Sequence, residues 1–563
     1  MNKGYELRVT SYKILCVIVL YVLAVFSALS QNDGSKLGRI TGNFQLDGQY
    51  YIPDEIIGAD TVKDKVRANA FANINYTNGG FSAGFRYEFY LFPLIDFEKL
   101  GYVGQGLPHY YAGYNHEYFE VTVGSFYEQF GNGLIYRSYE NRNLGYDNAT
   151  NGVRIKGKPY KGIVLTGIWG TTRNFFSKHG QIRGIDGDFT FSSIFPKLAE
   201  KSFLLSAGAS MLSKYEKSTD PDYILPENVA AWAARVKFGY KDFNLGAEYA
   251  YKFNDPSSLN KMIYKEGEAL FLTMSYAAKG LGISLMGLRT DNMDFRTQRS
   301  AILNEHIINY IPTISREHTY ALPAMYPYGS QPLGQIGFQG QINYQIKKKS
   351  KLGGKYGTDI TLNYSRIHSI QQNPVDEAID ADGNINMKGT DGYTSSFFGF
   401  GDLLFQDLNI EISRKFNPKW KASLSYVFLT YNQAVIEGHV GEPNVVSHTA
   451  IGEVTYKINT KNALRLELQH LYAKEAKKNW LYAQLEYSIA PHWFISVLDR
   501  YNYGNPEPEK RVHYYGTNAS YVYKTTKISL TFGKQFEGIL CVGGVCRAVP
   551  ASYGLGLSVV SSF

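Results

Sequence analysis

The segment QIGFQGQINYQI, residues 335–346, alternates strictly between polar and apolar side chains. Its glutamines and asparagine fall at positions 335, 339, 341, 343 and 345, and its large apolar or aromatic residues fall at 336, 338, 342, 344 and 346. A β-strand turns successive side chains to opposite faces, so one face of this segment meets an apolar environment and the other meets water. The pattern recurs roughly two dozen times, down to the final residues YGLGLSVVSSF. It predicts a closed membrane barrel, apolar outside and polar inside.

The composition agrees with a barrel and argues against a helical membrane protein. Charged residues make up only 19% of the 563 residues, whereas aromatic residues reach 15% and include 46 tyrosines, which suit the interfacial girdles of a barrel. A mean hydropathy of −0.26 is too polar for a bundle of membrane helices. The basic residues are scattered or sit in short turns such as 347–349, so we expect no nucleic-acid partner.

The N-terminal segment predicts export. A basic region precedes an apolar run at 14–26, and small residues at 28–30 predict cleavage before Gln31. An uncleaved anchor is the alternative, although the apolar run is short for a membrane span. We therefore expect a signal peptide over 1–30 and a barrel over 31–563. Because the strand pattern starts near Ile40, we expect no separate plug domain before the barrel.

Short and long connections alternate along the chain. Turns at 78–80, 240–242 and 459–461 are short, whereas segments such as 127–150 and 291–334 are long. Bacterial outer-membrane barrels have short periplasmic turns and long outer loops. Hairpins centred on the short turns give about 24 strands, with both termini periplasmic.

This location implies specific partners. They are the lipid of the outer membrane and, during biogenesis, the barrel-assembly machinery. Phe563 ends the last alternating strand, and we interpret this terminal aromatic residue as an assembly signal.

Charged residues fall on the polar face of most strands, where the lumen would be. Arg86 and Glu88 alternate with aromatic residues, and Glu467 alternates with leucines. The segment 493–500 alternates poorly, so its two faces cannot be assigned.

Two cysteines, Cys541 and Cys546, follow the signal in the motif CVGGVC. The central glycines suit a two-residue primed turn, which places the cysteines opposite each other at a non-hydrogen-bonded position about 4.5 Å apart. Disulfides accept that separation and form in exported proteins. We expect a disulfide on an exposed outer loop. A metal site is the alternative, but no histidine or acidic residue lies nearby in sequence.

The best candidate for a functional site is the segment 124–142. It gathers Glu128, Arg137, Glu140 and Arg142 among aromatic residues, between two predicted strands. A barrel this wide needs something in its lumen, and a loop folded inward and held by carboxylate–guanidinium pairs would constrict it. The alternative is an ordinary outer loop whose charges are solvated.

Signals for metal binding and catalysis are weak. Asp380, Asp382 and two asparagines alternate in one long loop, but Ile385 stands where a calcium loop needs glycine, so we expect a plain polar turn. His368 and Ser369 are adjacent and would point to opposite faces of a strand. No hydrolase or nucleotide-binding motif is present in the sequence. We therefore expect no metal, no cofactor and no enzymatic activity.

Four stretches carry a resemblance to a known family: 123–157, 309–312, 352–357 and the segment from Cys541 to Cys546. Together they resemble uncharacterised outer-membrane barrels of the Bacteroidota, over nearly the whole mature chain. The resemblance implies the fold and the location only, because that family has no established activity.

Two functions remain open at this point. The first is passage or uptake of a solute through a loop-constricted lumen. The second is a structural or assembly role as a subunit of a larger envelope complex, with other envelope proteins as partners.

Overall fold

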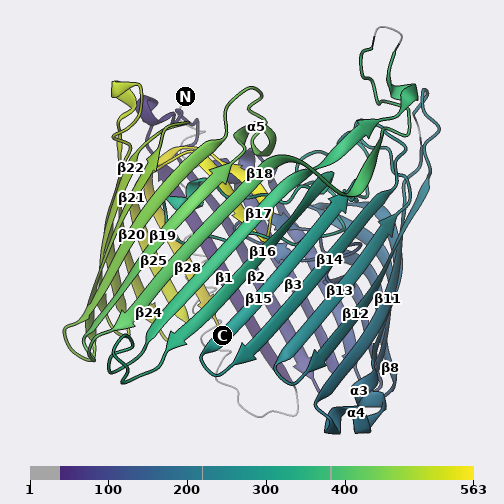
Figure 1. Ribbon diagram of the computed structural model, residues 1–563, viewed down its shortest axis with the longest axis horizontal. Helices are drawn as coiled ribbons and strands as arrows, with labels where there is room; N and C mark the ends of the chain where they lie inside the picture. The colour runs from purple at the N-terminus through teal and green to yellow at the C-terminus, as the bar shows by residue number, and fades with distance from the viewer. Residues whose placement is uncertain (1–37, 219, 381–382) are drawn as a thin grey trace, which may run out of the picture.

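The chain closes into one antiparallel barrel of 24 strands (Figure 1). The computed structural model describes residues 38–218, 220–380 and 383–563. The first strand, β1, pairs with β2 on one side and with the last strand, β28, on the other, so this sheet has no free edge. The predicted strand number is confirmed. The predicted signal peptide at 1–30 lies outside the described residues and stays a prediction.

The first half of the barrel contains β1 (Arg39–Tyr51), β2 (Val66–Asn78), β3 (Phe81–Phe92), β4 (Gly104–Asn115), β5 (Phe119–Phe126), β8 (Thr150–Tyr160), β9 (Ile163–Asn174), β10 (Ser177–Thr190), β11 (Phe203–Tyr215), β12 (Asn228–Tyr240), β13 (Phe243–Lys252) and β14 (Gly267–Ala278). The second half contains β15 (Leu281–Asp291), β16 (Gly334–Ile346), β17 (Thr358–Pro374), β18 (Tyr393–Lys415), β19 (Trp420–Tyr431), β20 (Val445–Lys457), β21 (Asn462–Ala473), β22 (Trp480–Ile489), β23 (Trp493–Tyr501), β24 (His513–Tyr523), β25 (Thr526–Gln535) and β28 (Ser552–Ser562).

Four short strands pair outside the barrel wall: β6 (Glu140–Asn141) with β7 (Tyr146–Asp147), and β26 (Gly538–Val542) with β27 (Val545–Val549). The helical turns are η1 (Glu55–Ile57), α2 (Ile95–Glu98), α3 (Phe191–Ile194), α4 (Pro196–Glu200), η2 (Pro323–Met325), η3 (Asp376–Ala378), α5 (Gln433–Ile436) and η4 (Pro508–Lys510). Within the described ranges, no helix is long and apolar enough to cross a bilayer.

The two rims of the barrel differ. At one, which we call the turn rim, short connections join the strands, and at the other, the loop rim, long connections rise (Figure 1). The start of β1 lies at the turn rim, since Arg39 is opposite Thr77 beside the turn at 79–80. The end of β28 lies there too, because Phe563 and Gly42 exchange backbone hydrogen bonds of 3.0 and 3.1 Å. The closing seam of the barrel therefore includes the terminal phenylalanine.

The faces of β16 and β21 follow the predicted alternation. On β16, Phe338 and Tyr344 are each 47% exposed on the outer surface, whereas Gln335 and Gln339 are buried inside. On β21, Leu468 is exposed outside and Glu467 is buried inside. Water cannot cover so continuous an apolar outer band at low cost, so the barrel wall spans a membrane and its polar face lines the lumen.

The lumen is filled by loops from the loop rim rather than by a separate domain within the described residues. Large apolar side chains from 127–149 and 292–333 are fully buried among the inward side chains of the wall: Phe130, Leu134, Ile135, Tyr136, Met293, Phe295, Ile308, Ile314 and Leu322. A solvated outer loop would leave such residues exposed. The predicted occlusion by infolded loops is confirmed.

Candidate functional site: the lumen plug

Two loops pack against each other inside the barrel, and we call residues 127–149 and 292–333 together the plug. Their backbones are joined directly: Arg137 N–H donates to the carbonyl of Ile308 at 2.9 Å, and Tyr310 N–H donates to the carbonyl of Gly133 at 2.9 Å. The amide of Asn309 donates to the carbonyl of Leu134 at 3.2 Å. Because each loop satisfies buried polar groups of the other, the two loops form one unit.

The plug contacts the wall at strands that lie far apart around the barrel. Asn132 donates from its backbone and its side chain to Glu248 of β13, at 2.8 and 2.6 Å. Across the lumen, the backbone N–H of Leu322 donates to Gln469 of β21 at 2.9 Å. The plug therefore bridges the lumen from one side of the barrel to the other.

One electrostatic attachment of the plug is a cluster of Arg86, Glu88, Glu140, Asp147 and Arg173, which we call the arginine–carboxylate network. Arg86 on β3 lies 2.7 Å from Glu88 and 2.8 Å from Glu140, and it also contacts Asp147. Arg173 on β9 lies 2.6 Å from Glu88 and also contacts Asp147. Both guanidinium side chains are at most 4% exposed. Two wall arginines thus hold two acids of the plug.

The two arginines of the network favour the ionised form of Asp147. Burial by itself opposes ionisation of Asp147, but Arg173 and Arg86 hold the pKa of that carboxyl below its usual range. Removing one member would leave a charge buried without its partner, which is costly.

Glu140 and Arg142 of the predicted constriction are brought together. Glu140 accepts from Arg142 Nε at 2.8 Å and also belongs to the network through Arg86. The guanidinium of Arg142 lies 4.0 Å from the ring centre of Phe71 on β2.

Glu128 and Arg137 do not pair with each other, and each finds a different kind of partner. Glu128 lies 3.2 Å from Arg154 and 3.1 Å from Lys156, both on β8 of the wall. Arg137 instead stacks on the rings of Tyr139 and Tyr310, at 4.4 and 4.0 Å from their centres. The carboxylate of Glu128 is therefore paired with cations of the wall, whereas the cation of Arg137 is stabilised by aromatic rings of the plug.

Sequence reasoning identified the infolding segment but missed most of its partners. Arg86 and Glu88 were expected to face the lumen, and they do, yet nothing in the pattern linked them to the loop. Asp147 and Arg173 were not identified at all. The only signal for Asp147 is its place in the same long connection, a few residues beyond the aromatic-rich stretch.

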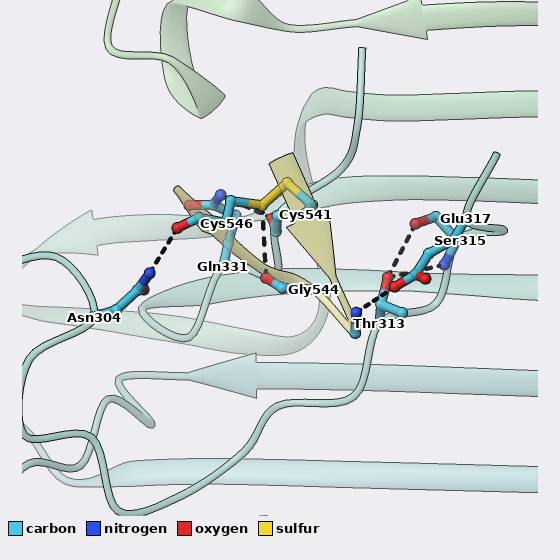
Figure 2. The surroundings of a disulfide bond; sticks show 10 residues. Asn304, Thr313, Ser315, Glu317, Gln331, Cys541, Gly544 and Cys546 are labelled. Carbon is cyan, nitrogen blue, oxygen red and sulfur yellow. Dashed lines mark hydrogen bonds between the residues drawn. A yellow bond between two sulfur atoms is a disulfide. The ribbon is translucent and has the colours of Figure 1, made fainter. Parts of the chain in front are cut away.

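The predicted disulfide between Cys541 and Cys546 is present, and it closes the hairpin β26–β27 (Figure 2). The two Cα atoms are 4.1 Å apart. Gly543 and Gly544 form the turn with φ of 60° and 84°, a left-handed conformation that glycine adopts without a steric penalty.

The hairpin is not on an exposed outer loop, and that expectation is wrong. Both cysteines are only half-exposed. Ser330 N–H donates to the carbonyl of Gly544 at 2.9 Å, and Asn304 donates to the carbonyl of Cys546 at 2.6 Å, as Figure 2 shows for Asn304. The neighbouring Arg547 donates to the carbonyl of Asn143 at 2.9 Å. The hairpin therefore lies on the plug and contacts both of its loops.

A cavity of about 590 Å³ remains between the plug and the wall of β1–β3. Its lining is rich in charge, including Asp47 from the wall and Glu140, Arg142 and Asp147 from the plug, with Arg547 from the hairpin. In the part of the chain that the structure describes, no three His, Cys, Asp or Glu side chains are grouped to hold a metal ion. Asp382, which belongs to the loop considered above for calcium binding, lies outside the described residues. The site is thus a polar gap beside an infolded plug.

Comparison with known proteins assigns the chain to a family. It belongs to the family of unknown function DUF6029, whose sequence profile matches residues 11–563. No curated protein matches the chain significantly.

Several solved outer-membrane structures are similar at low identity. The siderophore receptor PirA from Pseudomonas aeruginosa is 10% identical with a TM-score of 0.40, covering 94% of this chain and 81% of that one. The translocation pore of the P pilus usher PapC is 9% identical with a TM-score of 0.37, covering 93% and 99%. The copper transporter OprC is 11% identical with a TM-score of 0.38, covering 94% and 82%. These similarities are too distant for a function to be transferred.

Proposed function

We propose that this DUF6029 barrel lies in the bacterial outer membrane and passes a polar solute between its plug and its wall. The cavity of about 590 Å³ beside the plug is the observation that carries the proposal. It is bounded by wall and plug together, so a small displacement of the plug would widen it into a path along the lumen.

The charges along this gap fall into two groups. Arg86 and Arg173 are at most 4% exposed and hold the plug, whereas the side chains of Arg142 and Glu140 are 33% and 24% exposed. Charged side chains that stay partly exposed at a constriction discriminate between passing solutes by charge. We assign Arg142 and Glu140 to selection and the buried arginines to anchoring.

Planar-bilayer recording of the purified barrel tests solute passage. The change Asp147→Asn removes the acid shared by both buried arginines and should raise single-channel conductance, while Asp376→Asn on an outer turn should not. Equal conductance of wild type and Asp147→Asn, with correctly assembled barrels, would refute passage controlled by the plug.

A role as a subunit of an envelope complex is the second candidate, and one observation favours it. Strand β18 begins at Tyr393, whereas its pairing with β19 begins only at Phe405, so β17 and β18 run on beyond their neighbour at the loop rim (Figure 1). Phe398 and Phe400 on this extension are 75% and 58% exposed. An exposed apolar pair on a protruding hairpin suits contact with another protein.

Purification in a mild detergent distinguishes the two candidates. A protein that co-purifies in stoichiometric amount, and is lost with Phe398→Ser and Phe400→Ser, would favour the complex. A lone barrel with measurable conductance would favour the pore.

A further inference from the structure

A second cavity, of about 470 Å³, lies between the hairpin β26–β27, the plug and the strands β23–β25. Most of its lining is apolar or aromatic, with Met325 from the plug, Leu498 and Tyr514 from the wall, and Phe536 and Leu540 from the connection that carries the hairpin. Its volume lies within the range of small-molecule sites, about 300–1,000 Å³.

Arg500 stands out in this lining. Its position on β23 faces the lumen, between Tyr482 of β22 and Tyr514 of β24, which are its Cα partners. It makes no ion pair or hydrogen bond with any residue that the structure describes. Its guanidinium nitrogens are not fully covered by other protein atoms, so they border on open space.

The other basic residues of the lining are already matched by acids. Lys534 lies 2.6 Å from Asp54, and Arg547 lies 2.8 Å from Asp96. One positive charge in this cavity is therefore left over, and it belongs to Arg500.

We propose that this cavity binds an organic acid that has one carboxylate and a compact apolar body. The guanidinium of Arg500 matches a carboxylate through two parallel hydrogen bonds, and Tyr514 makes no hydrogen bond within the described residues that would compete for its hydroxyl. The apolar lining would cover the rest of the ligand. A second negative charge would find no unmatched cation, so a monoanion is selected over a dianion.

The proposal explains why a half-buried arginine faces an apolar cavity without a partner. A charge taken from water into the protein interior is costly unless it is paired, and a ligand carboxylate would supply the pair. A monocarboxylate of this kind would be the solute class of the proposed function. Binding stands on the cavity alone, and only the step from binding to passage rests on the proposed function.

Equilibrium dialysis of the full chain in detergent tests the site, with radiolabelled phenylacetate as the probe and phenylacetamide as its uncharged counterpart. Wild-type barrel should bind phenylacetate saturably and phenylacetamide much more weakly. The change Arg500→Met should weaken phenylacetate binding roughly 10- to 100-fold, the value of a hydrogen-bonded charge pair. Arg500→Lys should retain part of the affinity, because it keeps the charge but not the planar fork.

The matched control is Arg183→Met, which removes an arginine that is bonded to Asn228 at the exposed end of β10 and should leave binding unchanged. Absence of saturable phenylacetate binding to wild type, or equal binding by Arg500→Met, overturns the proposal. Failure of Arg500→Met to fold would also contradict the proposal, because an arginine without a partner in the protein should not be required for folding. Binding without conductance would overturn solute passage alone.

Discussion

Lumen-facing arginines have different surroundings in two parts of the barrel wall. On β3 and β9, Arg86 and Arg173 are surrounded by Glu88, Glu140 and Asp147. On β23, Arg500 has no such partner among the described residues and borders an apolar cavity. The difference teaches that a charge in the lumen has two uses. Where its partners come from the plug, it fixes the plug, and where no partner is supplied, the free guanidinium is available to a ligand.

The largest predicted effect comes from Arg86→Met, which should destabilise the attachment of the plug. The change removes one of the two cations of each of three carboxylates, which leaves Glu88 and Asp147 with Arg173 alone and Glu140 with Arg142 alone. Breaking a buried pair costs about 3–5 kcal/mol. Limited proteolysis should then cut within 127–149 at rates at least tenfold above those of wild type. Unchanged protection of this segment would show that the network does not hold the plug.

Arg500→Met should act with the opposite sign. Replacing an unpaired, half-buried charge by an apolar side chain of similar length is expected to be neutral or to stabilise the barrel by about 1–3 kcal/mol. Urea unfolding in detergent micelles, followed by tryptophan fluorescence, measures the change. A loss of stability as large as that of Arg86→Met would abolish the distinction between the two regions.

Much of the architecture could be predicted because strand alternation is a local property of the sequence. The 24 strands, the lumen-facing Arg86 and Glu88 and the turn of CVGGVC all follow from periodicity and turn chemistry. The network could not be predicted, because it joins strands and loops that are distant in sequence and depends on how the plug folds inward.

Arg500 escaped detection for a different reason. Its strand places Leu498 on the lumen side and Asp499 on the outer side, where Asp499 lies 2.7 Å from His513. This reverses the expected polarity of the two faces. The segment 493–500 therefore shows no clear alternation of polar and apolar residues. For this reason the alternation pattern did not identify Arg500 as a lumen-facing residue.

The disulfide offers a test of how far attachment of the plug depends on the hairpin. The double change Cys541→Ser and Cys546→Ser should cost no more than about 2 kcal/mol, because the ring that the bond closes is short. The barrel should stay folded in reducing buffer, while hydrogen exchange at Gly544 and Ser330 should accelerate. Unfolding of the whole barrel on reduction would assign the hairpin a far larger role than the network.

Arg137→Ala probes the aromatic attachment between the two plug loops. Loss of the contacts with Tyr139 and Tyr310 should cost about 1–2 kcal/mol, less than a break in the network. Proteolysis within 127–149 should rise only slightly. An effect equal to that of Arg86→Met would place the main attachment at Arg137.

The smallest effect concerns pH. Burial, and then the neighbouring His179, lower the pKa of His306 in the plug from 6.5 to about 4, with Glu305 opposing and Arg296 adding to the shift. An opened plug would regain a pKa near 6.5 and bind a proton more readily, so acidification between these two values should loosen the loop 292–333. Proteolysis of this loop should rise modestly between about pH 7 and pH 5, and His306→Gln should remove that rise. If His306→Gln left the pH response unchanged, the response would arise from other titratable groups.

Single-channel recording of wild type, Arg86→Met and Arg500→Met side by side tests most directly whether the network keeps the lumen constricted. Wild type and Arg500→Met should both show low conductance, whereas Arg86→Met should show larger and more frequent openings because its plug is released. Equal conductance for all three correctly assembled barrels would contradict a lumen constricted by the arginine–carboxylate network.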